Sequence, residues 1–471
     1  MIRRRTFTMR PAIGLIVTMF VCQVAAAAPF RAGLAAIDIT PPVGWRMSGY
    51  FYERLSTGTH DPLQAKAMVL QQGDERAALV FCDLIGVPAT ITGPVRAAAS
   101  KKTGIPAANI MIAATHTHTG PLYYGALREY LHERAVKANG KDPFEGVDYR
   151  QILSDRLVSV IVQANRQLIP VDLQVTKTNL TGLAFNRRYQ MKDGSVQFNP
   201  GKTNDNVVRP AGPVDPELIL LGLKRRDDRQ AIGCLTSFAL HADTVGGTDY
   251  GADFPGYLER SLRRVAGERF VSFFGNSACG DINHINVTDP RPQKGTVEAE
   301  RIGEVLGRRV AGSFRALQPV ERPHLMVRGE TVAIPLQKYS GAQIGEARQA
   351  MDGIGGKELP FLKQVEAYKI MDLQLRGGST LTAEVQVFRM GADTAMVALP
   401  GEIFCELGIL IRQRSPFRNT MIVELANDSI GYVPTLRAFK EGSYEVVNSR
   451  VEAGGGEKLV ETAVRLLQSF H

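Results

Sequence analysis

The sequence predicts an α/β fold, with large mixed sheets flanked by helices and a metal site at the carboxyl ends of strands. Two observations support this class. Short strand-like runs rich in Val, Ile and Phe alternate with longer segments whose apolar residues recur at helical spacing. Several of the strand-like runs also end in residues capable of metal binding or proton transfer. With 471 residues, the chain is long enough to bury a large core.

The predicted elements follow one another along most of the chain. Strands are expected at residues 77–83, 110–114, 172–178, 217–224, 231–239, 270–274, 394–399 and 420–425. Helices are expected at residues 93–102, 149–168, 254–265, 296–317, 403–414 and 458–470. The glycine-rich stretches 251–256 and 454–456 are expected to be loops. This alternation favours a sheet that is buried by helices.

Residues 1–28 are predicted to form an export signal. Four arginines lie within the first ten residues, an apolar stretch follows, and the alanines at 25–28 offer cleavage sites. Arg4 and Arg5 also resemble a twin-arginine signal, although an ordinary secretion signal is preferred. The apolar stretch is too short for a convincing membrane anchor. We therefore expect residues 29–471 to form one domain, periplasmic or secreted, with no transmembrane anchor.

Composition argues against a nucleic-acid partner and against a disulfide scaffold. Removing the four arginines of the signal lowers the net charge from +9 to +5, and no basic stripe is present. Four cysteines then remain, at positions 82, 234, 279 and 405. They are too sparse for a disulfide scaffold, and both buried thiols and a single bridge stay open. A small molecule is the expected partner.

Two histidines follow the predicted strand at 110–114. Because side chains alternate along a strand, His116 and His118 are expected to leave it on one face. The chain has only eight histidines, so two within three residues are unusual. The pair favours a metal site, or one imidazole that binds a metal beside another that handles protons. The alternative is two histidines that are only hydrogen-bonded at a strand end.

Other predicted strands also end in polar residues. His241 follows the strand at 231–239, Glu402 follows the one at 394–399, and Tyr432 lies beyond the one at 420–425. Ligands gather outside the carboxyl ends of strands in open α/β sheets, so these ends could converge. Two histidines, a glutamate and an open position are typical of a hydrolytic zinc centre. Each residue has a structural alternative, such as a first-turn helix charge for Glu402.

Five short motifs occur in an order that resembles a known family. They are AIDITPP at 36–42, HDPL at 60–63, THTHTGP at 115–121, NR at 186–187 and PGE at 400–402. Together they resemble the amino-terminal catalytic domain of the neutral/alkaline, non-lysosomal ceramidase family, over roughly residues 30–465. The resemblance implies a Zn²⁺ ion held by His116, His241, Glu402 and Tyr432. It also implies that His118 and Arg187 line the cleft as proton-handling or oxyanion-facing groups.

The sequence departs from the family pattern at three places. Family members carry Gly-Asp-Val-Ser-Pro where this chain has GDINH at 280–284, so Asn283 replaces a serine that the resemblance places beside the scissile bond. Thr119 replaces another serine, and we expect no counterpart of the family's carboxyl-terminal immunoglobulin-like domain. We expect the scaffold and the metal site to be retained despite these departures. Specificity for ceramide, however, does not follow from the resemblance.

The predicted function is that of an exported, zinc-dependent hydrolase of an amide (N-acyl) bond, acting through metal-activated water. His118, Arg187 and Asn283 are the predicted catalytic residues. One alternative is a metal-dependent esterase or lactonase, and another is a non-catalytic zinc-containing binding protein. The segment 120–144 mixes tyrosines with basic residues. If it lines the entrance instead of forming a surface helix, a smaller or anionic acyl compound is expected in preference to a long-chain sphingolipid.

Overall fold

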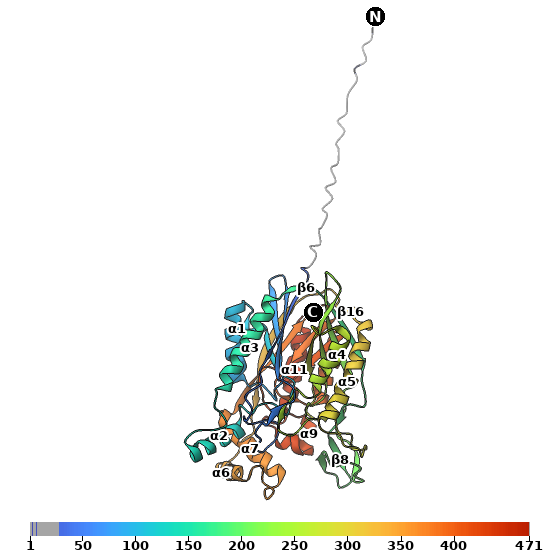
Figure 1. Ribbon diagram of the computed structural model, residues 1–471. Helices are drawn as coiled ribbons and strands as arrows, with labels where there is room; N and C mark the ends of the chain where they lie inside the picture. The colour runs from blue at the N-terminus through green and yellow to red at the C-terminus, as the bar shows by residue number, and fades with distance from the viewer. Residues whose placement is uncertain (1, 3–5, 7–27, 471) are drawn as a thin grey trace.

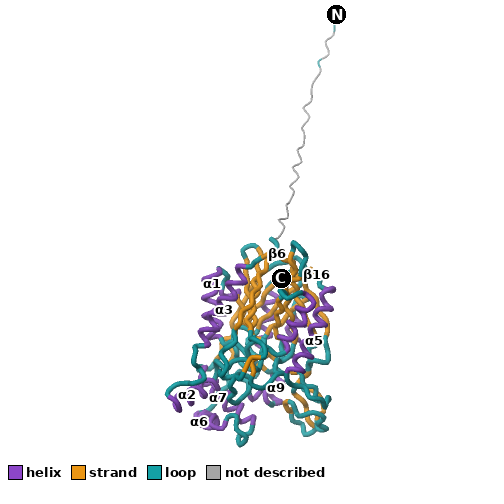
Figure 2. The backbone as a smooth tube through the Cα atoms, viewed as in Figure 1, coloured by secondary structure: helices purple, strands orange, loops and turns teal. Residues whose placement is uncertain are grey.

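The computed structural model describes Ile2, Thr6 and residues 28–470 of the chain. The predicted export signal therefore lies outside the described residues, apart from Ile2, Thr6 and Ala28. Figures 1 and 2 show helices on the outside of a central body of strands, and loops with short helices at one end of that body. The candidate site lies at this loop-rich end.

The larger sheet has nine strands in the order β14-β12-β11-β6-β1-β3-β4-β5, with β16 paired to β6. These are β1 (Arg31–Asp38), β3 (Gln64–Gln72), β4 (Glu75–Cys82), β5 (Ile110–Ala114), β6 (Ile169–Asn179), β11 (Glu217–Arg225), β12 (Ala231–Phe238), β14 (Val271–Asn276) and β16 (Gln318–Pro319). The pairs β12–β14 and β4–β5 are parallel, and the other pairs are antiparallel. The sheet is therefore mixed.

A second sheet has the order β17-β18-β19-β21, and only its β19–β21 pair is parallel. Its strands are β17 (Met326–Pro335), β18 (Thr380–Arg389), β19 (Thr394–Ala398) and β21 (Asn419–Val423). Three short two-stranded pairings are also present: β2 (Gly58–Thr59) with β13 (Asp249–Tyr250), β7 (Phe185–Asn186) with β15 (Ile282–Asn283), and β20 (Glu402–Ile403) with β22 (Tyr432–Val433). A small three-stranded sheet pairs β8 (Arg188–Met191) with β9 (Val196–Phe198) and β10 (Val207–Pro210).

The described helices are α1 (Ala89–Thr103), α2 (Ala126–Asn139), α3 (Tyr149–Arg166), α4 (Phe254–Ala266), α5 (Thr296–Ser313), α6 (Gly341–Ala350), α7 (Phe361–Arg376), α8 (Cys405–Arg414), α9 (Leu436–Glu441), α10 (Tyr444–Val447) and α11 (Gly455–Gln468). Three 3₁₀ turns complete the set, at Ala107–Asn109, Phe314–Ala316 and Met351–Gly353. Among the residues that the structure describes, no helix is both long and apolar enough to cross a membrane.

These elements form four layers. Helices α1 and α3 pack on one half of the larger sheet, and α4 and α5 pack on the other half. The opposite face of that sheet packs against the second sheet. Helices α8 and α11 cover the far side of the second sheet. The order helix, sheet, sheet, helix confirms the predicted α/β class.

Strand β4 shows why the central strands read as unbroken apolar runs. Ala78, Val80 and Cys82 contact the helix layer, while the alternate residues Leu79 and Phe81 face the second sheet. A strand that is covered on both faces has no solvent side, so its sequence does not alternate between polar and apolar residues. Cys82 and the other three described cysteines are buried and free, so no bridge joins them.

Most predicted elements are present with ends shifted by a few residues. The helix expected from residue 403 begins at Cys405, because Glu402 and Ile403 form β20 against Tyr432 and Val433. The helix expected at 296–317 ends at Ser313 and continues as a 3₁₀ turn. The predicted loops at 251–256 and 454–456 are wrong in part, since α4 begins at Phe254 and α11 at Gly455.

The carboxyl ends of strands from both sheets meet at the loop-rich end. At the end of β5, the Ala114 amide donates to the Leu425 carbonyl, and Ala113 forms a bridge with Ala426. The Glu424 amide donates to the Asn276 carbonyl at the end of β14. The ends of β5 and β14 are therefore both held against the segment that follows β21, which brings distant parts of the sequence together.

Candidate metal centre

His116 leaves the end of β5 through an unusual backbone conformation. Its φ is +71°, in the left-handed region that side chains with a Cβ rarely adopt. The strand ends at Ala114, and residues 115–117 are irregular before a turn at His118 and Thr119. Strand alternation is therefore not what directs His116 and His118 to the same place. Such conformations cost about 1–3 kcal/mol and are concentrated at functional sites. The predicted pairing of the two histidines is correct, but the reason given by the strand pattern is wrong.

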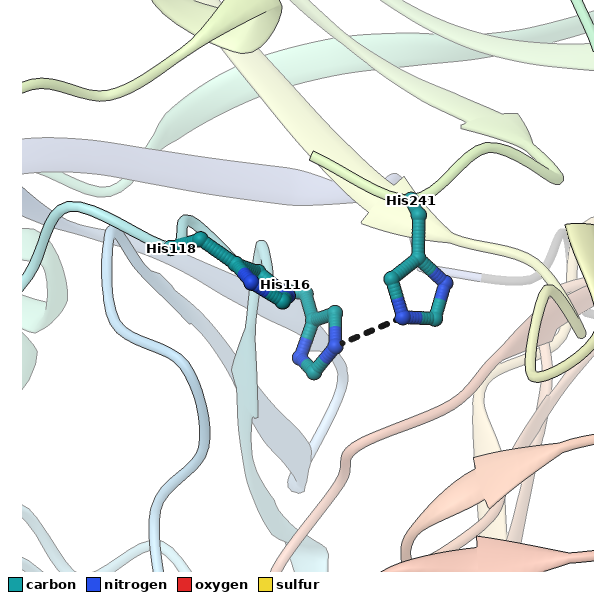
Figure 3. A group of neighbouring side chains, drawn as sticks. All are labelled: His116, His118 and His241. Atoms are coloured by element: carbon teal, nitrogen blue, oxygen red, sulfur yellow. Dashed lines mark hydrogen bonds between the residues drawn. The ribbon is translucent and has the colours of Figure 1, made fainter. Parts of the chain in front are cut away.

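Two histidines meet through their Nε2 atoms. His116 Nδ1–H donates to the Ile85 carbonyl at 2.7 Å, and His241 Nδ1–H donates to the Cys279 carbonyl at 2.9 Å. A neutral imidazole has one N–H, so each Nε2 carries a lone pair. These two nitrogens lie 3.0 Å apart, as Figure 3 shows. Burial lowers the pKa of His241 to about 4, which favours its neutral form.

Glu402 brings a carboxylate to the same point. Its Oε2 lies 3.3 Å from His116 Nε2 and 3.3 Å from His241 Nε2, and it is buried without a hydrogen-bond partner. When both rings are neutral and donate through Nδ1, two imidazole lone pairs and a carboxylate oxygen converge at this point. This arrangement is repulsive unless a cation lies among the three atoms, because each is an acceptor.

The spacing of these atoms fits a small divalent ion. Ligand arms of 2.0–2.1 Å in tetrahedral geometry place neighbouring ligand atoms about 3.3 Å apart. The three distances of 3.0, 3.3 and 3.3 Å agree with that value. Nitrogen and carboxylate donors suit zinc among the common metals. The donor set thus fits the predicted ion.

Tyr432 is held beside this group by Arg187. Strands β20 and β22 pair so that Glu402 and Tyr432 are directly opposite. Arg187 donates from Nη2 to the Tyr432 hydroxyl at 3.0 Å and from Nε to Glu445 at 2.9 Å. Burial raises the pKa of Tyr432 well above its usual value, and the Arg187 cation acts in the opposite direction. Arg187 therefore supports the phenol that was expected to bind the metal.

His118 presents a second unprotonated nitrogen. Its Nδ1–H donates to the Gly49 carbonyl at 3.0 Å, while its Nε2 is buried with no partner. Its ring lies 5.0 Å from the His116 ring and 5.8 Å from the His241 ring, between centroids. Burial, reinforced by His116, lowers its pKa to about 3. His118 is thus a neutral imidazole that can accept a proton near the metal group. The three histidines also form a geometrically possible metal-binding set by themselves.

A pocket of about 820 Å³, including its solvent-open part, ends at these residues. His116, His118, Glu402 and Tyr432 line its inner end. One wall is aromatic and is formed by Tyr50, Phe51, Tyr368 and Tyr444. Another is polar and includes Asp372, Arg376, Ser429 and Arg450.

Two predicted catalytic residues do not line this pocket. Arg187 is 2% exposed, and its guanidinium is engaged by Glu445, Tyr432 and the Gly280 carbonyl, so it lies behind Tyr432 and not in the cleft. Asn283 is fully buried, and its amide donates to Asn199. The bond from Arg187 to Tyr432 is the only one of these contacts that reaches a predicted ligand.

The charged part of the segment 120–144 also lies outside the pocket. Leu122, Tyr124 and Leu127 line it, which places the start of α2 at the wall. Arg128 instead pairs with Glu145 and Glu129. The charged entrance that the sequence suggested is therefore not formed by α2.

Sequence reasoning missed the aromatic residues of the site. Tyr444 lies 5.5 Å from Tyr432 between ring centroids, and Tyr50 contacts the His118 ring edge-on at 6.1 Å. Both lie in segments that match no catalytic motif, and aromatic residues are common in ordinary hydrophobic cores. Nothing in their spacing distinguishes them, so only the fold reveals them.

Gly49 allows a test of how closely the backbone must approach His118. A Cβ at Gly49, where φ is +106°, lies 2.5 Å from the His118 carbonyl oxygen and 2.7 Å from its Cβ. Gly49→Ala is therefore expected to displace His118 and lower kcat by about tenfold or more, since small misplacements of catalytic groups are costly. Gly44→Ala is the matched control, because Gly44 has φ +91° and no atom within 4 Å of the added Cβ.

Both substitutions should reduce stability by about 1–3 kcal/mol through backbone strain, measured by denaturant unfolding. Only Gly49→Ala should lose activity per folded molecule. Equal activity in the two variants would show that the position of His118 does not depend on Gly49.

Comparison with known proteins agrees with these observations. The sequence profile of the neutral/alkaline non-lysosomal ceramidase family, N-terminal, matches residues 30–299. A crystal structure of neutral ceramidase from Pseudomonas aeruginosa has a TM-score of 0.69 at 20% identity, covering 94% of this chain and 75% of that one. A structure described as ceramidase complexed with C2 has a TM-score of 0.70 at 17% identity, with the same coverage. No curated protein matches the sequence.

Proposed function

Because the chain belongs to the neutral/alkaline non-lysosomal ceramidase family, we propose that it hydrolyses the amide bond of an N-acyl compound with the help of zinc. His116, His241, Glu402 and Tyr432 are the proposed ligands. The observation that carries the proposal is the convergence of His116 Nε2, His241 Nε2 and Glu402 Oε2 within 3.0–3.3 Å at the inner end of a pocket.

The roles of the protein groups follow from their contacts. A bound zinc ion lowers the pKa of a coordinated water to about 7 and polarises a carbonyl. His118 Nε2 faces this group as a free acceptor, so it is the proposed proton carrier between water and the departing amine. Arg187 is proposed to orient the Tyr432 phenol, a different role from the oxyanion contact that the sequence suggested. Asn283 has no proposed role in the chemistry.

An enzyme fits the site better than a zinc-containing binding protein. Structural zinc sites are closed by four protein ligands, and four are proposed here, so catalysis requires a further coordination position that water can reach. Here Glu402 and Tyr432 line a pocket that also contains His118, so the inner end is accessible from outside. An esterase or lactonase would use the same groups, and the family favours the amide.

The aromatic wall suggests an apolar acyl chain. Rings extend from Tyr432 through Tyr444 to Phe51 and on to Phe361, with centroid separations of 5.5, 6.4 and 5.9 Å. Phe361 is 48% exposed, so this series reaches the surface. The case for a smaller or anionic substrate relied on a charged entrance at α2 and on Asn283, and neither lines the pocket. Ceramide is therefore a proposed substrate, together with simpler N-acyl amides.

Phe51 is expected to influence acyl-chain preference. Phe51→Ala removes an aromatic surface from the pocket wall, and each buried methylene contributes about 0.8 kcal/mol. We expect kcat/KM to fall about tenfold for a long-chain ceramide and by less than about twofold for a two-carbon acyl analogue. Tyr52→Ala is the control, because Tyr52 is 45% exposed and does not line the pocket. A uniform loss across chain lengths would contradict an acyl path along this wall.

The proposed function is tested by assaying purified protein on matched N-acyl amides and esters, with short and long acyl chains. Turnover of the amides that a chelator abolishes and zinc restores is expected. Faster ester than amide turnover would favour the esterase alternative, and complete inactivity of metal-loaded protein would favour the binding protein. Export, with cleavage near residue 28, is a further proposal that amino-terminal sequencing of the mature protein would test.

A further inference from the structure

A fully buried carboxyl group, Glu424, lies directly behind the metal group. Its exposure is 0%, and none of the ion pairs of the described residues includes it. Burial raises its pKa well above the usual value. Burying a carboxyl group that pairs with no cation destabilises a fold. The two hydrogen bonds that Glu424 does accept therefore indicate what the side chain is there to hold.

The first bond leads to Glu402. Glu424 Oε2 accepts from the Ile403 backbone amide at 2.6 Å. Ile403 is the residue after Glu402, and the two form β20 against β22. Glu424 thus fixes the backbone immediately beside one proposed ligand.

The second bond leads to His241. The Cys279 thiol donates to Glu424 Oε1 at 2.9 Å. The carbonyl of the same Cys279 accepts the His241 Nδ1–H, the bond that leaves Nε2 free for a metal. The backbone around Cys279 is itself tied to β20, because the Gly280 amide donates to the Ile403 carbonyl at 2.8 Å. One side chain therefore connects the supports of two ligands from distant parts of the chain.

We propose that Glu424 is a positioning residue that holds His241 and Glu402 in the separation a metal ion requires. This inference rests on the proposed function. Partners one bond removed from a metal orient its ligands, and losing them typically weakens metal binding or activity by about 10–100-fold. An apolar residue could fill the same space but could hold neither Cys279 nor the Ile403 amide.

Three variants separate the two bonds. Glu424→Gln keeps a carbonyl oxygen for the Ile403 amide but cannot accept the thiol proton. Glu424→Leu removes both bonds. Cys279→Ala removes the thiol, including its 3.4 Å contact with His241 Nδ1, while retaining the carbonyl that binds His241. The matched control is Glu259→Gln, since Glu259 is also buried but pairs with Lys66 at 2.7 Å, away from the metal group.

Zinc affinity of the metal-free full chain is measured by competition with a chromogenic chelator, and Tm is recorded for the same samples. Glu424→Gln should bind zinc about tenfold more weakly, and Glu424→Leu about 10–100-fold more weakly. Adding Cys279→Ala to Glu424→Gln should weaken binding by no more than about a further twofold, because both changes remove the same bond. Glu259→Gln should lower Tm and leave the affinity unchanged.

Zinc affinities of both Glu424 variants within twofold of wild type, with Tm reduced as in Glu259→Gln, would overturn the positioning role while leaving the proposed function intact. Failure of the wild-type chain to bind zinc would overturn the proposed function and this inference together. The wild-type titration therefore distinguishes the two failures.

Discussion

Replacing His118 with glutamine is expected to lower kcat by about 10²–10⁴-fold while one zinc ion per chain remains bound. The loss is the usual contribution of a proton-transferring group. His118 Nε2 is buried and has no hydrogen-bond partner, so its lone pair is free to take up a proton. Glutamine can still donate to the Gly49 carbonyl but cannot carry a proton. Activity and metal content are measured on the same preparation.

His60→Gln is the control, since His60 contacts the Tyr257 hydroxyl and does not line the pocket. Loss of zinc from the His118→Gln variant would identify His118 as a ligand, consistent with the three-histidine set and contrary to the proposed division of roles. Unchanged kcat would exclude His118 from proton transfer.

Replacing His241 with alanine is expected to abolish stoichiometric zinc binding and to reduce activity by at least about 10³-fold. His241 has no exposed surface, and its Nε2 is one of the three converging acceptors. Without it, Glu402 and His116 lose the geometry that a small cation requires, and the several kcal/mol of transition-state stabilisation from the metal are lost. Metal analysis after gel filtration and the amide assay check this result.

His284→Gln is the matched control, because His284 is equally buried but binds Asp243 and the Gln293 carbonyl. This variant should retain the metal. A His241→Ala protein with full zinc content and activity would show that the metal, if present, lies elsewhere.

The sequence predicted the correct fold class, but it did not predict every strand of the four-layer fold. Runs such as residues 110–114 were recognised because a strand buried on both faces is continuously apolar. Strands β1, β3, β17 and β18 were not predicted. In β17 many positions are partly exposed, so its sequence lacks such a run. The start of the helix after Glu402 was misplaced because pairing between β20 and β22 depends on residues that are distant in sequence.

The candidate site was predictable to the extent that its residues stand at strand ends or in motifs. His116, His241 and Glu402 do converge, as expected from the ends of three strands. The positions of Arg187 and Asn283 could not be predicted, since local sequence does not show whether a side chain faces a cleft or a neighbouring segment. Glu424 was noted only as part of a strand, because its importance arises from contacts with Cys279 and Ile403.

The order in which the chain is synthesised determines when the four proposed metal ligands can come together. His116 and His241 are 125 positions apart, and Tyr432 pairs with Glu402 only after β22 has formed. A ribosome must therefore complete nearly the whole described chain before the four proposed ligands can meet. No contiguous half of the protein contains the group, so neither half can capture zinc in this way. Loading of the proposed metal would therefore be a late event in the maturation of the chain.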